Sequence, residues 1–175
     1  MRTKYKKPRG VSEGMEEYSL GCVIGQNLFL VAYFGVGFLG MLPLRFAGIP
    51  IASLIYAFFL ALMLIFVLRK HLCTSCYYYG KICHVGWSKL ALMFKKNSGN
   101  RELGFKLASI TWFLATIFPI VGILVVLFIS RSIETMVLFL IFIMLTPINF
   151  LIHKKACKTC KERDKCKLSM AKSGS

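Results

Sequence analysis

Long stretches without a charged side chain dominate the pattern of this chain. Four segments contain no Asp, Glu, Lys or Arg, namely Tyr18–Leu44, Phe46–Leu68, Leu107–Ser130 and Thr135–His153. A helix needs about 20 apolar residues to cross a hydrocarbon core of about 30 Å, so each segment is long enough to span a membrane. The sequence therefore predicts an all-α integral membrane protein with four transmembrane helices.

Two of the three connections between these segments are short. The first carries two prolines and a glycine around Arg45, which is typical of a tight turn, and the second is little more than the sequence SRSIE. The connection in the middle of the chain is much longer. We therefore expect two helical hairpins that cross the membrane in the same orientation.

The distribution of charge predicts which side of the membrane each connection faces. The chain has 23 Lys and Arg against 7 Asp and Glu, a formal net charge of +16. All basic residues except Arg45 and Arg131 lie in residues 1–19, 69–106 and 153–175. Because Lys and Arg are enriched in cytoplasmic loops, both termini and the middle connection should lie in the cytosol, with the protein integral to the cell membrane. Charges that follow this topology disfavour nucleic-acid binding.

Six of the seven cysteines fall in two motifs, each directly after an apolar segment. HLCTSCYYYGKICH covers residues 71–84, and ACKTCKERDKC covers residues 156–166. The first two cysteines of one motif are 84 residues from their counterparts in the other, and the third cysteines are 83 apart. This match predicts an internal duplication, in which each hairpin is followed by a cytosolic cysteine motif. In the reducing cytosol, such cysteines indicate metal or redox chemistry rather than disulfide bonds.

The predicted organisation has five parts. They are a basic cytosolic N-terminus (1–17), a first hairpin with its cysteine motif (18–83), a cytosolic amphipathic segment (84–104), a second hairpin with its cysteine motif (105–166) and a basic tail (167–175). Within the amphipathic segment, one helical face is apolar, which predicts a helix over Trp87–Lys96. This helix either lies on the inner leaflet or packs on the cysteine motifs. Its apolar face consists of Trp87, Leu90, Ala91 and Phe94.

The spacing of the cysteines is typical of a thiolate metal site. A Cys-x2-Cys pair can present both sulfurs to one ion, and two such pairs complete a tetrahedral four-thiolate zinc site. The third cysteine of each motif provides for a second ion. An iron–sulfur cluster is the alternative cofactor, and reactive dithiols are a further alternative. The predicted metal ligands are Cys73, Cys76, Cys83, Cys157, Cys160 and Cys166.

The same spacing resembles the six-cysteine binuclear zinc clusters of fungal transcription factors, in which two zinc ions share six thiolates. The resemblance implies that Cys73 and Cys157 bridge the two ions. It implies nothing about DNA recognition, and here two predicted spans separate the halves of the motif. Residues 73–87 also resemble small uncharacterised archaeal membrane proteins, from which no function carries over.

A few further residues lie close to these features. His71, His84 and His153 flank the motifs and are candidates for substitute ligands or for interfacial and supporting residues, whereas Cys22 is expected to pack as a small apolar residue. Gly21 and Gly25 form a small-xxx-small pair, which predicts close helix packing.

The sequence gives little support to catalysis, since no phosphate-binding loop, Ser-His-Asp order or metalloprotease motif is present. We therefore expect a structural or adapter membrane protein whose cytosolic metal site clamps the helix bundle. The expected partners are the lipid bilayer and, at the basic face, anionic lipid headgroups or an acidic cytosolic protein. A membrane redox protein with an iron–sulfur cluster or reactive cytosolic dithiols is the alternative function.

Overall fold

Helices form nearly all of the regular structure in the computed structural model, which describes residues 14–170. The outer parts of the predicted basic N-terminus and basic tail, residues 1–13 and 171–175, lie outside the described residues. The helices belong to one all-helical chain, and no strand occurs between residues 14 and 170. The long elements are α1 (Leu20–Gly40), α2 (Ile51–Ala61), α4 (Arg101–Ser130) and α5 (Ile133–Thr159).

The line of α2 continues through two short elements. A π-helical turn, η1, covers Leu62–Val67, and α3 covers Leu68–His71. At the end of η1 the backbone N–H of Leu68 donates to the carbonyl of Met63, five residues back. Together these pieces and the following 3₁₀ turn form one helical rod over residues 51–75.

Four helices are long and apolar enough to cross a membrane, as the charge-free segments predict. They cover residues 20–40, 51–75, 101–130 and 133–159, with mean hydropathies of 1.8, 2.8, 2.7 and 2.4. Many of their large apolar side chains point outward, among them Phe128, Val31 and Phe58. An apolar surface of this extent is unfavourable in water, so the fold indicates a membrane protein.

Two helices are longer than the apolar segments that predicted them. α4 begins at Arg101 because the side chain of Asn100 caps it, accepting the backbone N–H of Leu103 at 3.1 Å. α5 continues beyond His153 to Thr159 through several lysines. Positive charges are favourable at the C-terminal end of a helix, where they oppose its dipole. As a result Cys157 lies on a helix rather than in a turn.

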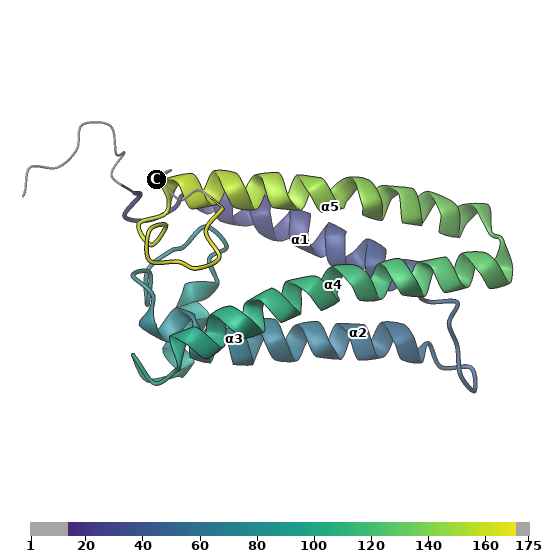
Figure 1. Ribbon diagram of the computed structural model, residues 1–175, viewed down its shortest axis with the longest axis horizontal. Coiled ribbons are helices and arrows are strands. Elements are labelled where there is room, and N and C mark those ends of the chain that lie inside the picture. The colour runs from purple at the N-terminus through teal and green to yellow at the C-terminus, as the bar shows by residue number, and fades with distance from the viewer. Residues whose placement is uncertain (1–13, 171–175) are drawn as a thin grey trace, which may run out of the picture.

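The ends of the helices fall into two groups. Figure 1 shows the α1–α2 and α4–α5 connections at one end of the bundle, and residues 72–100 and 160–170 at the other. The first connection contains a tight turn, in which Phe46 and Ile49 exchange backbone hydrogen bonds of 2.9 and 3.0 Å. Gly48 sits in this turn with φ of 81°, a conformation that glycine adopts without steric cost.

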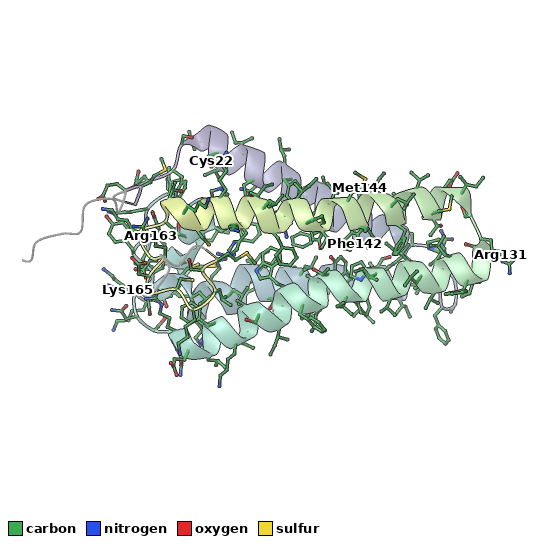
Figure 2. The ribbon with its side chains drawn as sticks, turned by 45° about the horizontal axis from the view of Figure 1, so that its top comes forward. Cys22, Arg131, Phe142, Met144, Arg163 and Lys165 are labelled. Atoms are coloured by element: carbon green, nitrogen blue, oxygen red, sulfur yellow. The ribbon has the colours of Figure 1, made fainter. Side chains whose placement is uncertain are left out.

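A stack of side chains fills the middle of the bundle. The rings of Tyr33 and Phe142 lie 4.8 Å apart, and both residues are fully buried. The Tyr33 hydroxyl is within hydrogen-bonding distance of the hydroxyls of Thr116 (3.1 Å) and Thr146 (3.4 Å). Figure 2 shows Phe142 pointing between the helices, whereas Met144, two residues further, points outward. The buried polar groups are thus satisfied within the bundle, as a bilayer requires.

A proline in α4 creates a hydrogen bond between helices. Pro119 has no backbone N–H, so the carbonyl of Ala115, four residues before it, loses its helical partner. The hydroxyl of Tyr56 on α2 donates to this carbonyl at 2.9 Å. Tyr56 is 2% exposed, so the bond lies in the core. The side chain from α2 therefore replaces the bond that the proline removes.

Close helix packing occurs at other glycines than predicted. A Cβ atom added at Gly21 or Gly25 would meet nothing within 4 Å, so the small-xxx-small prediction is wrong for this chain. A Cβ at Gly37 would lie 3.1 Å from side-chain atoms of Phe142 and Pro119. The close approach of α1 to α4 and α5 therefore lies near the opposite end of α1.

The amphipathic segment adopts a 3₁₀ helix, η3 (Trp87–Met93), in place of the predicted α-helix. It packs against α3 and the 3₁₀ turn η2 (Cys73–Ser75), with Ala91 buried. Leu90 is exposed, so the predicted apolar face is not buried as a unit. The segment therefore packs on a cysteine motif, while Leu90, Leu92 and Met93 stay exposed.

Candidate metal centre

The two cysteine motifs lie at the same end of the bundle. The first begins in η2, directly after α3, and the second begins in the last turn of α5. Figure 1 shows the teal segment after α3 and the yellow segment after α5 side by side at this end. Figure 2 shows Arg163 and Lys165 at the same end and Arg131 at the opposite one.

A carboxylate joins the two motifs directly. The backbone N–H of Tyr77, in the first motif, donates to the side chain of Glu162, in the second, at 3.1 Å. Glu162 also forms an ion pair with Arg101 at the start of α4. A second link runs from the backbone N–H of Lys161 to the hydroxyl of Tyr78 at 3.3 Å. These contacts bring together segments more than 80 residues apart in the sequence.

The two Cys-x2-Cys pairs share one backbone hydrogen bond and the conformation of their second cysteine. In each pair the second cysteine donates its N–H to the carbonyl of the first, at 3.3 Å in both motifs. The second cysteines are extended, with φ/ψ of −86°/150° at Cys76 and −80°/133° at Cys160. The carbonyl of every cysteine in the two motifs accepts the N–H of the residue three positions later. The six donors are Cys76, Tyr79, Gly86, Cys160, Arg163 and Ser169.

Backbone N–H groups also point at sulfur atoms. Three sulfurs each interact with the backbone amide of the residue two positions later. The pairs are Cys76 with Tyr78, Cys160 with Glu162, and Cys166 with Leu168. Burial raises the pKa of Cys76 to about 12, and these amide bonds oppose the shift. Burial likewise raises the pKa of Cys160 and of Cys166. Without a metal these thiols therefore keep their protons at neutral pH.

The sulfurs of the two motifs influence one another. Burial is the largest cause of the raised pKa of Cys76, and the nearby sulfurs of Cys73 and Cys160 raise it further. The sulfurs of Cys157 and Cys166 likewise raise the pKa of Cys160. Sulfurs from both halves of the chain are thus within electrostatic range at this end of the bundle.

A buried cation contacts the first motif. Arg69 is 8% exposed, and its Nη1 donates to the Sγ of Cys73 at 3.1 Å, while its Nε donates to the carbonyl of Leu64 at 2.7 Å. The guanidinium also lies 4.6 Å from the ring centre of Trp87. Between residues 14 and 170 no carboxylate pairs with it, so a negative charge on sulfur would compensate a buried positive one.

The three histidines have different surroundings. The Nε2 of His153 lies 3.5 Å from the Sγ of Cys157. The Nδ1 of His71 accepts the backbone N–H of Asn100 at 3.2 Å. His84 meets the ring of Tyr18 edge-on, 5.3 Å between centroids, and burial, followed by the neighbouring His153, lowers the pKa of His84. Of the three imidazoles, that of His153 is the one with a close sulfur contact.

The predicted ligands are near one another but do not form a closed coordination shell. All seven cysteines, Cys22 included, are free thiols. In the described part of the chain, no group of three or more Cys, His, Asp or Glu side chains has its donor atoms arranged to hold a metal ion. Metal binding by these residues therefore requires side chains of the two motifs to turn toward a common point.

No known protein family matches the chain, and no curated protein or solved structure matches it.

Proposed function

We propose that this chain is a small polytopic membrane protein in which a cysteine-ligated zinc site, of one or two ions, clamps the cytosolic ends of the helices. Its helices form two same-orientation hairpins that arose by internal duplication. The protein acts as a structural or adapter component rather than as an enzyme. The observation that carries this proposal is the matched pair of Cys-x2-Cys turns, which have equal hydrogen bonds and meet at one end of the bundle.

The backbone around the sulfurs supports a thiolate metal site. Amide N–H groups aimed at Cys76, Cys160 and Cys166 favour the negatively charged form of sulfur, which is the form that binds metal. A metal ion would displace the protons that burial otherwise retains on these thiols. The surrounding polypeptide is thus suited to hold several thiolates once an ion is bound.

The surrounding charge also supports this site. Six thiolates with two divalent ions leave two net negative charges, and the guanidinium of Arg69 contacts Cys73 directly. The excess of basic side chains at this end of the bundle supplies further positive charge. The same basic residues define the cytosolic side by the positive-inside rule.

Ions shared by the motifs would hold three parts of the bundle together. The first motif continues the rod of α2 and α3, and the second continues α5. The segment after the first motif is tied to α1, since Asn27 accepts from the indole N–H of Trp87 at 2.5 Å and donates to the carbonyl of Val85 at 2.9 Å. A structural metal site contributes folding free energy in proportion to its affinity.

Anionic lipid headgroups are the partner that the surface favours. Leu90, Leu92 and Met93 are exposed beside Lys89 on η3, which combines apolar side chains for the bilayer with a cation for its surface. Reduced co-purification of anionic lipid after substitution of Lys89, Lys95 and Lys96 by Ala would support this partner. An acidic protein captured with unchanged lipid would support the adapter role through protein contacts instead.

Elemental analysis of protein purified in detergent without oxygen tests the metal site. We expect zinc in one or two equivalents, with a colourless sample, and a loss of zinc in C76S and in C160S but not in C22S. Iron, sulfide and a brown colour would instead favour the iron–sulfur alternative. Equal metal content in all three variants would contradict the assignment of the ligands.

A reporter fused to the C-terminus tests the topology independently. The positive-inside distribution predicts that a reporter that folds only in the cytosol is active there, and that a reporter active only outside the membrane is silent. The opposite result would contradict the cytosolic position of the motifs without bearing on whether they bind metal.

A further inference from the structure

The pair formed by His153 and Cys157 supports an inference that rests on the proposed function and specifies its site. Residues four apart lie on the same face of an α-helix, one turn apart. The Nε2 of His153 lies 3.5 Å from the Sγ of Cys157. In a tetrahedral zinc site, with Zn–S near 2.3 Å and Zn–N near 2.0–2.1 Å, sulfur and nitrogen ligands lie about 3.5–3.6 Å apart. The pair therefore has the spacing of two ligands to one ion.

The other side of the imidazole also has the partner that a metal ligand requires. The ring of His153 donates a hydrogen bond to the backbone carbonyl of Leu168. Metal-bound histidines nearly always donate their second ring N–H to a carbonyl, carboxylate or water, which fixes the tautomer and leaves the other nitrogen free to bind. Leu168 packs against the hydrophobic core, so its carbonyl is held in place.

Two further cysteines of the second motif, Cys160 and Cys166, lie on the segment that follows α5. This segment folds back over the helix end, where the backbone of Met170 hydrogen-bonds to the sulfur of Cys157. The sulfur of Cys157 lies within electrostatic range of those of Cys160 and Cys166. Cys157 is buried and His153 is exposed, which gives an ion a route to the pair from the surface.

We propose that His153 is a metal ligand and binds the same zinc ion as Cys157. The last turns of α5 fix this edge of the tetrahedron, and cysteines of the two motifs turn toward the ion to supply the other two sulfurs. The ion is then shared by the two motifs, as the proposed clamp requires.

Cobalt substitution and zinc competition on the full-length protein in detergent test this assignment. We expect H153A to lose at least about 100-fold in affinity for one zinc ion, more than the loss of a supporting residue causes. H153C should retain the ion and show stronger sulfur-to-cobalt charge-transfer absorption, because a fourth thiolate replaces nitrogen. H71A is the matched control, since the Nδ1 of His71 already accepts the N–H of Asn100, and it should leave affinity and spectrum unchanged.

The outcomes separate this inference from the proposed function. Wild-type protein that binds metal, with H153A unchanged in affinity and spectrum, would overturn the assignment of His153 alone. Wild-type protein that binds no stoichiometric metal would overturn both. Retention of metal by H153C excludes unfolding as the cause of loss in H153A, and failure of H153C to retain it would count against a ligand at this position.

Discussion

The backbone N–H of Tyr77 donates to the carboxylate of Glu162 across 85 positions of sequence, at 3.1 Å. Glu162 is largely buried, with its side chain 13% exposed, and it also pairs with Arg101. One carboxylate therefore links both cysteine motifs to the start of α4. In a strongly basic region, this negative charge holds three segments that would otherwise repel one another.

Replacement of Glu162 by Gln should destabilise the folded protein. The substitution keeps the shape of the side chain but removes its charge from two hydrogen-bonded contacts, and such contacts contribute about 1.5–3 kcal/mol each. Thermal unfolding in detergent measures the effect. D164N is the control, because Asp164 is exposed and its pair with Arg163 spans 3.6 Å, where the expected change is below about 1 kcal/mol. Equal shifts in both variants would contradict the linking role.

The hydrogen bond from Tyr56 to the carbonyl freed by Pro119 should give an energetic coupling between these two residues. Y56F should lower the free energy of unfolding by about 0.6–1.7 kcal/mol, between the average and the largest value for hydrogen bonds between membrane helices. P119A restores a backbone N–H to the carbonyl of Ala115 and should make Y56F less costly. Equilibrium unfolding of both single variants and the double variant gives this coupling. Strict additivity would show that the two residues act independently.

Replacement of Gly37 by Leu should destabilise the protein more than the same replacement of Gly25. A Leu side chain at position 37 meets Phe142 and Pro119, with its Cβ already 3.1 Å from both, and overpacking of this kind costs about 1–3 kcal/mol. G25L is the matched control on the same helix, where a Cβ has open space. Unfolding midpoints in one detergent compare the two. A larger loss in G25L would restore the small-xxx-small interface as a contact with another molecule.

Alkylation of Cys76 in metal-stripped protein should be slow at neutral pH. Burial raises the pKa of Cys76 to about 12, so the reactive thiolate is rare near pH 8 and grows about tenfold with each pH unit up to that value. Mass spectrometry after timed iodoacetamide treatment, between pH 7 and 10 in a C22S background, measures the slope. Fast labelling that is independent of pH would favour reactive dithiols over a metal site.

The four long apolar helices could be predicted because a helix of a water-soluble protein rarely runs for about 20 residues without a charged side chain. The meeting of the two motifs at one end follows from the same pattern, since two spans return the chain to the side from which it started. The continuation of α5 to Thr159 did not follow, because its lysines suggested a boundary but are compatible with a helix C-terminus.

The roles of individual charged residues were harder to predict. Arg69 counted as one more positive charge at the end of a span, yet it is buried against Cys73. Glu162 is one of two carboxylates within a basic motif. An acidic residue among so many basic ones was the available signal that its side chain forms a buried contact. Pattern alone also failed at Trp87–Lys96, where contacts with α3 and η2 determine the conformation rather than helical periodicity.

The π-helical turn η1 has a consequence for which residues face inward beyond it. A π turn takes in one residue more than an α turn, which rotates every later side chain by about 100° around the axis. Because Leu68 bonds to Met63, the carbonyl of Leu64 is left to accept the Arg69 side chain. Deleting one residue from Leu62–Val67 would rotate Arg69 and Cys73 together away from the side of the bundle that they now face. The π turn thus determines where around the bundle this cation and its thiol partner are placed.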